Sequence, residues 1–421
     1  MVQLLAIIDI RRINMETKPI IHSDSYITMP KGFKANGVCC NMKGNGNLDM
    51  ALVYSELPCV VAGVYTSNLV KGHSLTRSID IINKQGPING IVINSKVANS
   101  CVGQIGVADA EQVATEIATK LGISSENILT ASTGVIGTRL LLDKMLPKVD
   151  ELVSGLGDDE ESGHKAMRAI MTTDTVPKEV SATVTLKDGA EITIAAMAKG
   201  SGMIHPNLAT MISVFTTDAA ISYEKLSPIL KRSVSHTFNR VSVDGDTSVC
   251  DSVMVFANGA SGVTIDNNED LELFEEAMTK LSEDLARMIA ADGEGATKLI
   301  EIEVFGAKDA NDAKLIVTSI ARSPLCKTAI FGMDANFGRF ITACGYSGAS
   351  FDPNKIDLYL GDMQMYKDGI ALDIDEDAAV ELLKEHDVYI KVVLYEGDAY
   401  DRMFTCDFSY DYVEINGSYR S

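Results

Sequence analysis

The sequence contains AKGSGMIHPNLATMISVFTT at residues 198–217, in which a glycine-rich, partly polar first half is followed by an apolar run. Glycines open it, and they allow backbone conformations that are strained for other residues. The small residue Ala209 then precedes Thr210, and the apolar run at 211–215 predicts a buried strand. A small residue, a threonine and a buried strand, in that order, are typical of a precursor that cleaves its own backbone.

The chemistry of such a precursor gives Thr210 a specific role. Its hydroxyl attacks the carbonyl of Ala209, the acyl group shifts from nitrogen to oxygen, and water hydrolyses the ester. Thr210 then carries a free α-amine, and the unperturbed pKa of such an amine, about 7.7–8.0, suits a general base at neutral pH. A threonine paired with its own amine is an activated nucleophile. The pattern alone also fits an ordinary threonine at the start of a strand, and His205 is better explained as a loop histidine than as a catalytic base.

Composition narrows the class of protein. The chain has 421 residues, is 46% hydrophobic and 23% charged, and carries a formal net charge of −21. These values are typical of a soluble globular protein with the length of two or three domains. Nucleic acid is excluded as an expected partner, because no basic cluster is present to bind phosphates. An anionic substrate would need a locally placed cation.

We expect no membrane partner and a cytoplasmic location. The apolar run at residues 4–8 is too short for a signal peptide, and no stretch approaches the roughly 20 apolar residues of a spanning helix. The eight cysteines form no C-x-x-C pair, so the sequence predicts reduced, buried thiols and no metal site.

The spacing of apolar residues predicts a mixture of helices and strands. A helix is expected over residues 109–121, with a capping box at its start and Gly122 as its end. A second helix is expected over residues 270–291. Strands are expected over residues 300–304, 388–394 and 404–408. The mixture favours an α/β or α+β fold with mixed sheets over a regular parallel barrel.

Several enzyme classes are set aside because their motifs are incomplete. The glycine-rich segments at 43–47, 132–137 and 199–203 complete neither a phosphate-binding loop nor a dinucleotide fingerprint. There is also no G-x-S-x-G nucleophile elbow.

The stretch at 198–217 resembles the cleavage region of the ornithine acetyltransferase family, the glutamate N-acetyltransferases of arginine biosynthesis. Six further blocks resemble that family and occur in its order from about residue 25 to the end. They are STGVIG at 132–137, AIMTTDT at 169–175, VSVDGDTS at 241–248, DGEGAT at 292–297, SPLCKTAIFG at 323–332 and YDYVEIN at 410–416.

The resemblance implies a role for each matching residue. Thr210 would be the nucleophile, and Thr133 with Gly134 would form the oxyanion hole after the strand expected at 128–131. Such a donor typically contributes around 3 kcal/mol to lowering the barrier. Lys199 would supply the cation for an α-carboxylate, and Glu294 would accept hydrogen bonds from an amine. The full set of implied substrate contacts is Thr172, Lys199, Thr210, Glu294, Asn416 and Ser421.

The resemblance also implies a fold and an assembly. The expected fold is a four-layer α/β/β/α sandwich of the ornithine acetyltransferase and self-processing aminopeptidase type, with a smaller α/β region at about 300–421. Cleavage would give an α chain of residues 1–209 and a β chain of residues 210–421. Two copies of each chain would form a heterotetramer.

The implied reaction is acetyl transfer from N-acetylornithine to glutamate through an acetyl ester on Thr210. It requires no metal and no organic cofactor. The sequence does not decide whether acetyl-CoA also serves as a donor, which would make the enzyme bifunctional.

Some positions depart from the family pattern, and two alternative functions stay open. Val249 and Cys250 replace the more common Thr-Asn, Met333 and Phe337 stand where an acidic residue and a tryptophan are typical, and Ser421 replaces a terminal threonine. None of these changes removes a catalytic atom. The first alternative is an N-terminal-nucleophile aminopeptidase or amidohydrolase of the same fold. The second is a non-catalytic binding or assembly protein in which Thr210 is merely structural.

Overall fold

The computed structural model describes residues 19–205 and 211–418. Within these ranges nine strands form the larger sheet. In spatial order they are β1 (Ile20–Ile21), β6 (Lys178–Thr185), β7 (Glu191–Lys199), β8 (Ile212–Thr217), β10 (Ser252–Ala257), β3 (Met50–Tyr65), β4 (Ile88–Asn94) and β5 (Ile128–Ser132), with β2 (Phe33–Val38) paired to β3 beside this path.

The long strand β3 divides this sheet into two layers. It runs for 16 residues, and its pairing with β4 shifts register between Tyr54 and Cys59. Its first half pairs with β2 and β4, whereas its second half pairs with β10. One layer therefore contains β2, β4 and β5, and the other contains β10, β8, β7, β6 and β1.

Successive side chains point to opposite faces of each strand layer, and each face packs in a hydrophobic core. On β8, Ile212 and Val214 face an inner core that also receives Ile91 and Ile93 of β4. Phe215 faces the opposite way, toward helices α7 (Tyr223–His236) and α8 (Asn268–Ala291). The outer face of the β4 layer packs against α3 (Ile105–Leu121) and α5 (Val149–Ser154).

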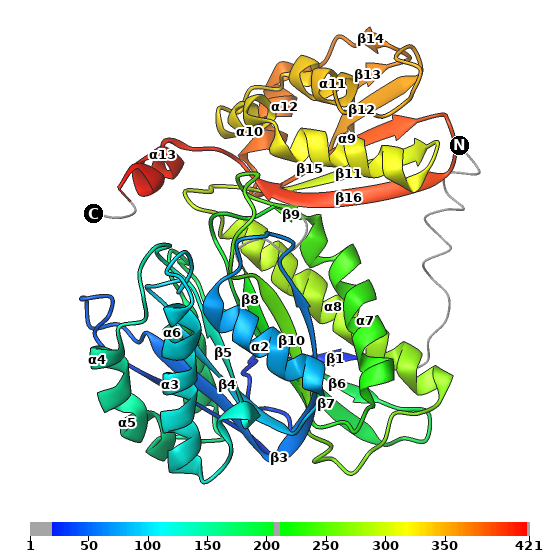
Figure 1. Cartoon of the computed structure of the whole chain (residues 1–421). Coiled ribbons are helices and arrows are strands. Elements are labelled where there is room, and N and C mark those ends of the chain that lie inside the picture. The colour runs from blue at the N-terminus through cyan, green and yellow to red at the C-terminus, as the bar shows by residue number, and fades with distance from the viewer. Residues whose placement is uncertain (1–18, 206–210, 419–421) are drawn as a thin grey trace.

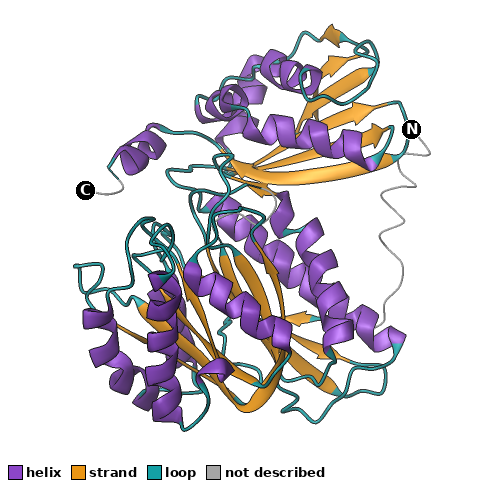
Figure 2. Cartoon of the chain, viewed as in Figure 1, coloured by secondary structure: helices purple, strands orange, loops and turns teal. Residues whose placement is uncertain are grey.

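The result is the four-layer α/β/β/α arrangement predicted from the sequence. Figure 2 shows the two strand layers between α3 and α5 on one side and α7 and α8 on the other. Helices α2 (His73–Lys84) and α6 (Glu160–Ile170) close the flanks of the inner core, and the short α4 (Leu142–Met145) precedes α5.

A second, seven-stranded sheet is formed mainly by the C-terminal part of the described chain. Its order is β14 (Ile370–Ala371), β13 (Met363–Lys367), β12 (Ile356–Leu360), β15 (Asp387–Leu394), β11 (Leu299–Ala307), β16 (Ala399–Cys406) and β9 (Val241–Ser242).

Four helices pack on one face of this second sheet, and α8 packs against part of the other face. Its helices are α9 (Ala310–Arg322), α10 (Pro324–Phe331), α11 (Phe337–Gly345) and α12 (Glu376–Lys384), which share one apolar core with it. Phe404 and Cys406 instead join the core around α8, so this helix links the two sheets. The last helix, α13 (Tyr410–Gly417), projects to the side of the molecule (Figure 1).

Most predicted elements agree with the structure, but one strand end and one helix start are wrong. The strand expected over 404–408 ends at Cys406, where β16 ends. The helix expected over 270–291 is confirmed as α8, and the strands expected near 300, 388 and 404 lie in β11, β15 and β16. The start expected at residue 109 is wrong, because α3 begins one turn earlier, at Ile105. The carboxylate of Asp109 is buried inside the helix and accepts two hydrogen bonds from Arg139 at 2.9 and 2.7 Å, so it does not cap the helix.

Six of the eight cysteines are buried, as expected, but Cys39 is half-buried and Cys101 is exposed. Cys101 lies in a bend shortly before α3, with a positive φ of 59°. All eight are free thiols, and the described residues contain no group of side chains suited to a metal ion. None of the described helices is long and apolar enough to cross a bilayer.

Phe274 on α8 should be a major contributor to stability, since its side chain is fully buried in the core between α8 and the larger sheet. We predict that Phe274→Ala lowers the free energy of unfolding by about 3–5 kcal/mol, because it removes buried surface and leaves a cavity. Urea unfolding followed by circular dichroism measures this loss. Glu276→Ala, at an exposed position of the same helix, should change stability by no more than about 0.5 kcal/mol. Equal losses of stability in the two variants would contradict a special contribution of the buried Phe274 side chain.

Candidate active site

A cavity of about 310 Å³ lies where the ends of β5, β7, α6 and α8 converge beside α13. Its lining comes from segments that are far apart in the sequence. The lining residues are Ala98, Thr133, Gly134, Val135, Ile136, Thr172, Thr173, Lys199, Gly202, Met203, Ser248, Val249, Cys250, Glu294 and Asn416.

All predicted site residues that the structure describes line this one cavity. They are Thr133, Gly134, Thr172, Lys199, Glu294 and Asn416. Ala209, Thr210 and Ser421 lie outside the described residues. The roles that the family resemblance gives to these residues stay predictions.

The turn at Thr133 and Gly134 follows directly after β5. Gly134 has a φ of +127°, and a Cβ there would lie 2.2 Å from the carbonyl carbon of Lys96, so only glycine fits. The amides of Thr133 and Val135 donate to the carbonyls of Asn94 and Lys96. The amide of Gly134 donates to no other described residue, which leaves it available as a donor beside the Thr133 hydroxyl.

Lys199 is the last residue of β7, and its side chain is buried at the floor of the cavity. Its ammonium lies 3.8 Å from Asp174 Oδ2. No hydrogen bond joins this ammonium to another residue of the described part of the chain. The cation that an acidic protein needs for an anionic substrate is therefore present inside the cavity.

Glu294 follows α8 and faces the same cavity, only 6% exposed. Its amide donates to the carbonyl of Ser201 at 3.0 Å, and its Oε2 accepts from Asn416 Nδ2 at 2.8 Å. Gly202 makes room for it, because a Cβ at residue 202 would lie 2.2 Å from the carboxyl carbon of Glu294. Asn416 thus connects α13 to the site.

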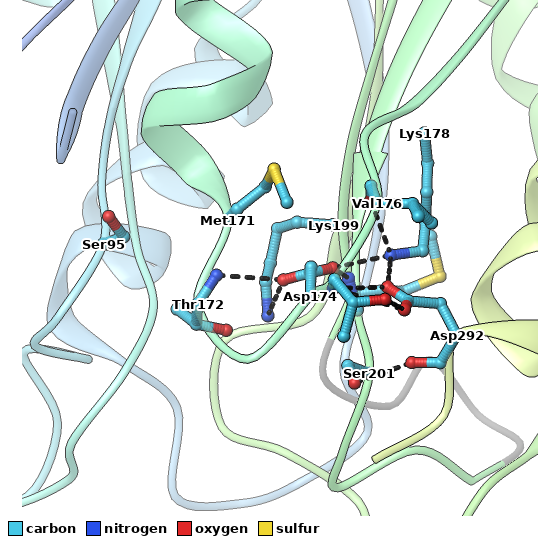
Figure 3. Close-up of polar contacts among 12 residues, drawn as sticks. Ser95, Met171, Thr172, Asp174, Val176, Lys178, Lys199, Ser201 and Asp292 are labelled. Carbon is cyan, nitrogen blue, oxygen red and sulfur yellow. Dashed lines mark hydrogen bonds and ion pairs between the residues drawn. The ribbon is translucent and has the colours of Figure 1, made fainter. Parts of the chain in front are cut away.

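A buried ionic network lies beside Thr172 and Lys199 (Figure 3). Asp174 accepts hydrogen bonds from the amides of Thr172 at 2.9 Å and Gly200 at 2.6 Å, and from the ammonium of Lys178 at 2.9 Å. Burial alone would raise the pKa of Asp174. Lys199, Lys178 and the Thr172 amide outweigh burial, so its pKa lies well below the ordinary value for an aspartate.

Asp251 anchors the start of β8, next to the predicted cleavage position. Its side chain is fully buried and accepts a hydrogen bond from the amide of Met211 at 3.0 Å. Burial raises the pKa of Asp251 well above its usual value, and the Met211 amide and the charge of Lys199 oppose this only in part.

One wall of the cavity is apolar. Val249 and Cys250, the pair that departs from the family pattern, pack with Ala98 and Ile136 in a small apolar cluster. The Cys250 thiol donates to the carbonyl of Ala98, and burial raises its pKa, so it remains a protonated, apolar surface. The cavity therefore has a charged end and an apolar wall, as a small amphiphilic molecule such as an amino acid requires.

Sequence reasoning missed Asp174, Lys178, Asp292 and Asp251. Asp174 and Asp292 lie in two of the family-like blocks, at 169–175 and 292–297, and this was their only signal. Lys178 and Asp251 lie outside those blocks, and no local pattern distinguishes them from ordinary charged residues. Their burial follows from tertiary packing alone.

The chain is similar to known proteins over most of its length. The family model described as the ArgJ family matches residues 34–421. The chain belongs to the ArgJ family. The chain is 45% identical over 401 residues to the arginine biosynthesis bifunctional protein ArgJ of Symbiobacterium thermophilum, covering 94% of this chain and 98% of the relative.

Two further proteins are similar to this chain. The ArgJ protein of Caldanaerobacter subterraneus is 44% identical over 404 residues, covering 94% of this chain and 99% of the relative. A solved structure of the ornithine acetyltransferase from Mycobacterium tuberculosis complexed with ornithine is 34% identical, with a TM-score of 0.42, over 46% of this chain and 100% of the solved one.

His205 lies outside the cavity that holds the predicted site residues. It lines a separate hollow with Lys314 and Arg322 of α9, and its Nδ1 lies 3.1 Å from the Ser242 hydroxyl. Burial, with a smaller contribution from Arg322 and Lys314, lowers the pKa of His205 to about 4. The imidazole is therefore neutral at pH 7.

The lowered pKa predicts an acid-sensitive contribution to stability. An unfolded histidine has a pKa of about 6.5, so between that pH and about pH 4 the unfolded state binds more protons than the folded state. The free energy of unfolding should fall as the pH drops through this window. We expect His205→Gln to fall less steeply than wild type in urea unfolding series at pH 7, 6, 5 and 4.5. His236→Gln, at an exposed histidine, should keep the wild-type slope. A His205→Gln slope equal to wild type would contradict the assignment.

Proposed function

We propose that this chain is an acyltransferase that moves an acetyl group from N-acetylornithine to glutamate in arginine biosynthesis. The single observation that carries the proposal is the cavity in which Thr133, Gly134, Lys199 and Glu294 converge from four separate segments. It offers oxyanion donors, a buried cation and a carboxylate within one small space. The names of the ArgJ relatives, which place them in arginine biosynthesis, support the same function.

We further propose that the chain becomes active by cleaving itself between Ala209 and Thr210. In the first half-reaction, the Thr210 α-amine takes the hydroxyl proton and Oγ attacks the acetyl carbonyl. Thr133 and Gly134 stabilise the oxyanion, and ornithine leaves with the proton on its amine. In the second half-reaction, the amine of glutamate attacks the ester and releases Thr210. The acetyl group passes only between amines and a hydroxyl, so the scheme needs no cofactor.

The sheet supports the idea that the two cleaved parts stay together. β8 and β10 follow the cleavage position in sequence, yet they lie between β7 and β3, which precede it. Six residues of β8 pair with β7, and six residues of β10 pair with β3. We propose that the two parts form one unit, that two copies of each part make a heterotetramer, and that the enzyme is cytoplasmic.

A second acetyl donor is part of the proposal. The ArgJ relatives are named bifunctional proteins, and acetyl-CoA is the further donor that the sequence leaves open. Glutamate acetylation with acetyl-CoA alone, in the absence of N-acetylornithine, tests this directly.

Self-cleavage predicts two bands on a denaturing gel. The purified wild-type protein should separate into parts of 209 and 212 residues, and sequencing of the second part should begin Thr-Met-Ile. Thr210→Ala should leave one band, because it removes the attacking hydroxyl. Thr119→Ala, at an exposed threonine of α3, should still give two bands. A single uncut wild-type band would favour a non-catalytic binding protein.

Transfer through an acetyl ester predicts that release of ornithine depends on glutamate. With N-acetylornithine alone, we expect one burst of ornithine per site and an acetyl adduct on the C-terminal part in intact-mass spectra. Added glutamate should restore turnover with ping-pong kinetics. Ornithine release that is equally fast without glutamate would instead identify a hydrolase of the aminopeptidase or amidohydrolase type.

A further inference from the structure

Two buried lysines, Lys178 and Lys199, lie near the same aspartate beside the cavity, but they differ in their hydrogen-bond partners. The side chain of Lys178 is 0% exposed and that of Lys199 is 2% exposed. Lys199 lines the cavity and Lys178 does not. Both face Asp174, and Asp292 completes a set of two cations and two carboxylates.

The ammonium of Lys178 has a partner for each of its donors. It lies 2.9 Å from Asp174 Oδ1, 2.5 Å from Asp292 Oδ2 and 3.4 Å from the carbonyl of Val176. An ammonium has three N–H groups, so none is left for a ligand. Lys178 therefore binds other residues of the protein (Figure 3) and has no N–H group left for a bound molecule.

The ammonium of Lys199 is in the opposite situation. Its distance to Asp174 Oδ2 is 3.8 Å, which is beyond hydrogen-bonding length. It has no hydrogen-bond acceptor among the described residues, although it is buried. The carboxylate of Asp174 accepts hydrogen bonds from Lys178 and two backbone amides and none from Lys199, which contributes only its charge.

The same network connects the three segments that carry Thr172, Lys199 and Glu294. Asp174 holds the amides of Thr172 and Gly200. Asp292 accepts from the amide and the hydroxyl of Thr175, and its carbonyl accepts from the Ser201 hydroxyl at 2.7 Å. Lys178 bridges the two aspartates and so ties these segments together.

We propose that Lys178 is a positioning residue for the binding end of the cavity. By neutralising Asp174, it prevents Asp174 from capturing Lys199, and the ammonium of Lys199 stays available for the carboxylate of the substrate. Asp292 holds Lys178 in place for this task. The identity of the ligand rests on the proposed function, whereas the competition between the two lysines for Asp174 rests only on the geometry.

Two double variants, K178Q/D292N and K178Q/D174N, test the proposal. Both delete Lys178 and one carboxylate, so both keep the buried charge balanced and replace ions with neutral groups of similar size. They differ in which aspartate remains. In K178Q/D292N, Asp174 keeps its charge and has only Lys199 as a cation. In K178Q/D174N, no charged Asp174 is left to attract Lys199.

The proposal predicts opposite behaviour for the two variants. In crystals of K178Q/D292N, Lys199 Nζ should close from 3.8 Å to hydrogen-bonding distance from Asp174. Calorimetry should show ornithine binding weakened by at least about tenfold relative to wild type. K178Q/D174N should bind ornithine at least about fivefold more tightly than K178Q/D292N. Arg240→Gln/Asp401→Asn removes a largely buried ion pair away from the cavity and should bind as wild type does.

Equal loss of ornithine binding in both variants would overturn the proposal, because it would show that Lys178 only supports the fold. An unchanged distance between Lys199 and Asp174 in K178Q/D292N would also overturn it. If wild-type enzyme fails to bind ornithine, the proposed function fails instead. In that case the distance between Lys199 Nζ and Asp174 in the K178Q/D292N crystal still shows whether Lys178 positions Lys199 or only supports the fold.

Discussion

The placement of β8 at the centre of the larger sheet is the constraint on which the rest of the structure depends. All six residues of β8 are buried, and the strand pairs with β7 on one side and β10 on the other. A strand buried on both faces and both edges cannot shift its register without moving its apolar side chains to the wrong core. The residue before it is therefore held next to Asp251, whose carboxylate binds the amide of Met211.

The same placement explains why so many charges are buried near one cavity. β7 ends at Lys199 and β6 begins at Lys178, so adjacent strands bring two ammonium groups to one end of the sheet. Moving an ion from water into a protein interior costs several kcal/mol of free energy. Paired carboxylates offset this cost only when they lie at hydrogen-bonding distance and their other hydrogen bonds are also made. Asp174 and Asp292 arrive on loops after α6 and α8 and complete the pairing. The network is thus a condition for burying Lys199 and not a general source of stability.

The family resemblance implied the four layers and the cavity residues, whereas local sequence patterns predicted individual helices and strands. The apolar stripe of α8 and the alternation along β11 are local periodic signals, so both elements were predicted. The start of α8 differs by two residues, and β11 continues past the expected end at residue 304 to Ala307. The six cavity residues came from short blocks that resemble a family, not from local chemistry. The helix start at Asp109 was predicted wrongly because an aspartate can either cap a helix or form a buried ion pair. Only the tertiary contact with Arg139 shows that Asp109 forms the ion pair. Lys178 could not be predicted, since an isolated lysine is usually solvated and its two carboxylate partners lie 4 and 114 positions away.

The order of strands also limits what a break after residue 209 can do to the molecule. The segments on the two sides of that position alternate within one sheet and share the inner core, where Met197 packs in the same cluster as Ile212 and Met254. Thr133, Gly134, Thr172 and Lys199 come from the first segment, and Glu294 and Asn416 from the second. A cavity lined from both segments exists only while the sheet is intact, and the paired residues of β8 begin at Ile212, after that position. The pairing of β8 with its two neighbouring strands therefore does not require the chain to be continuous at that position.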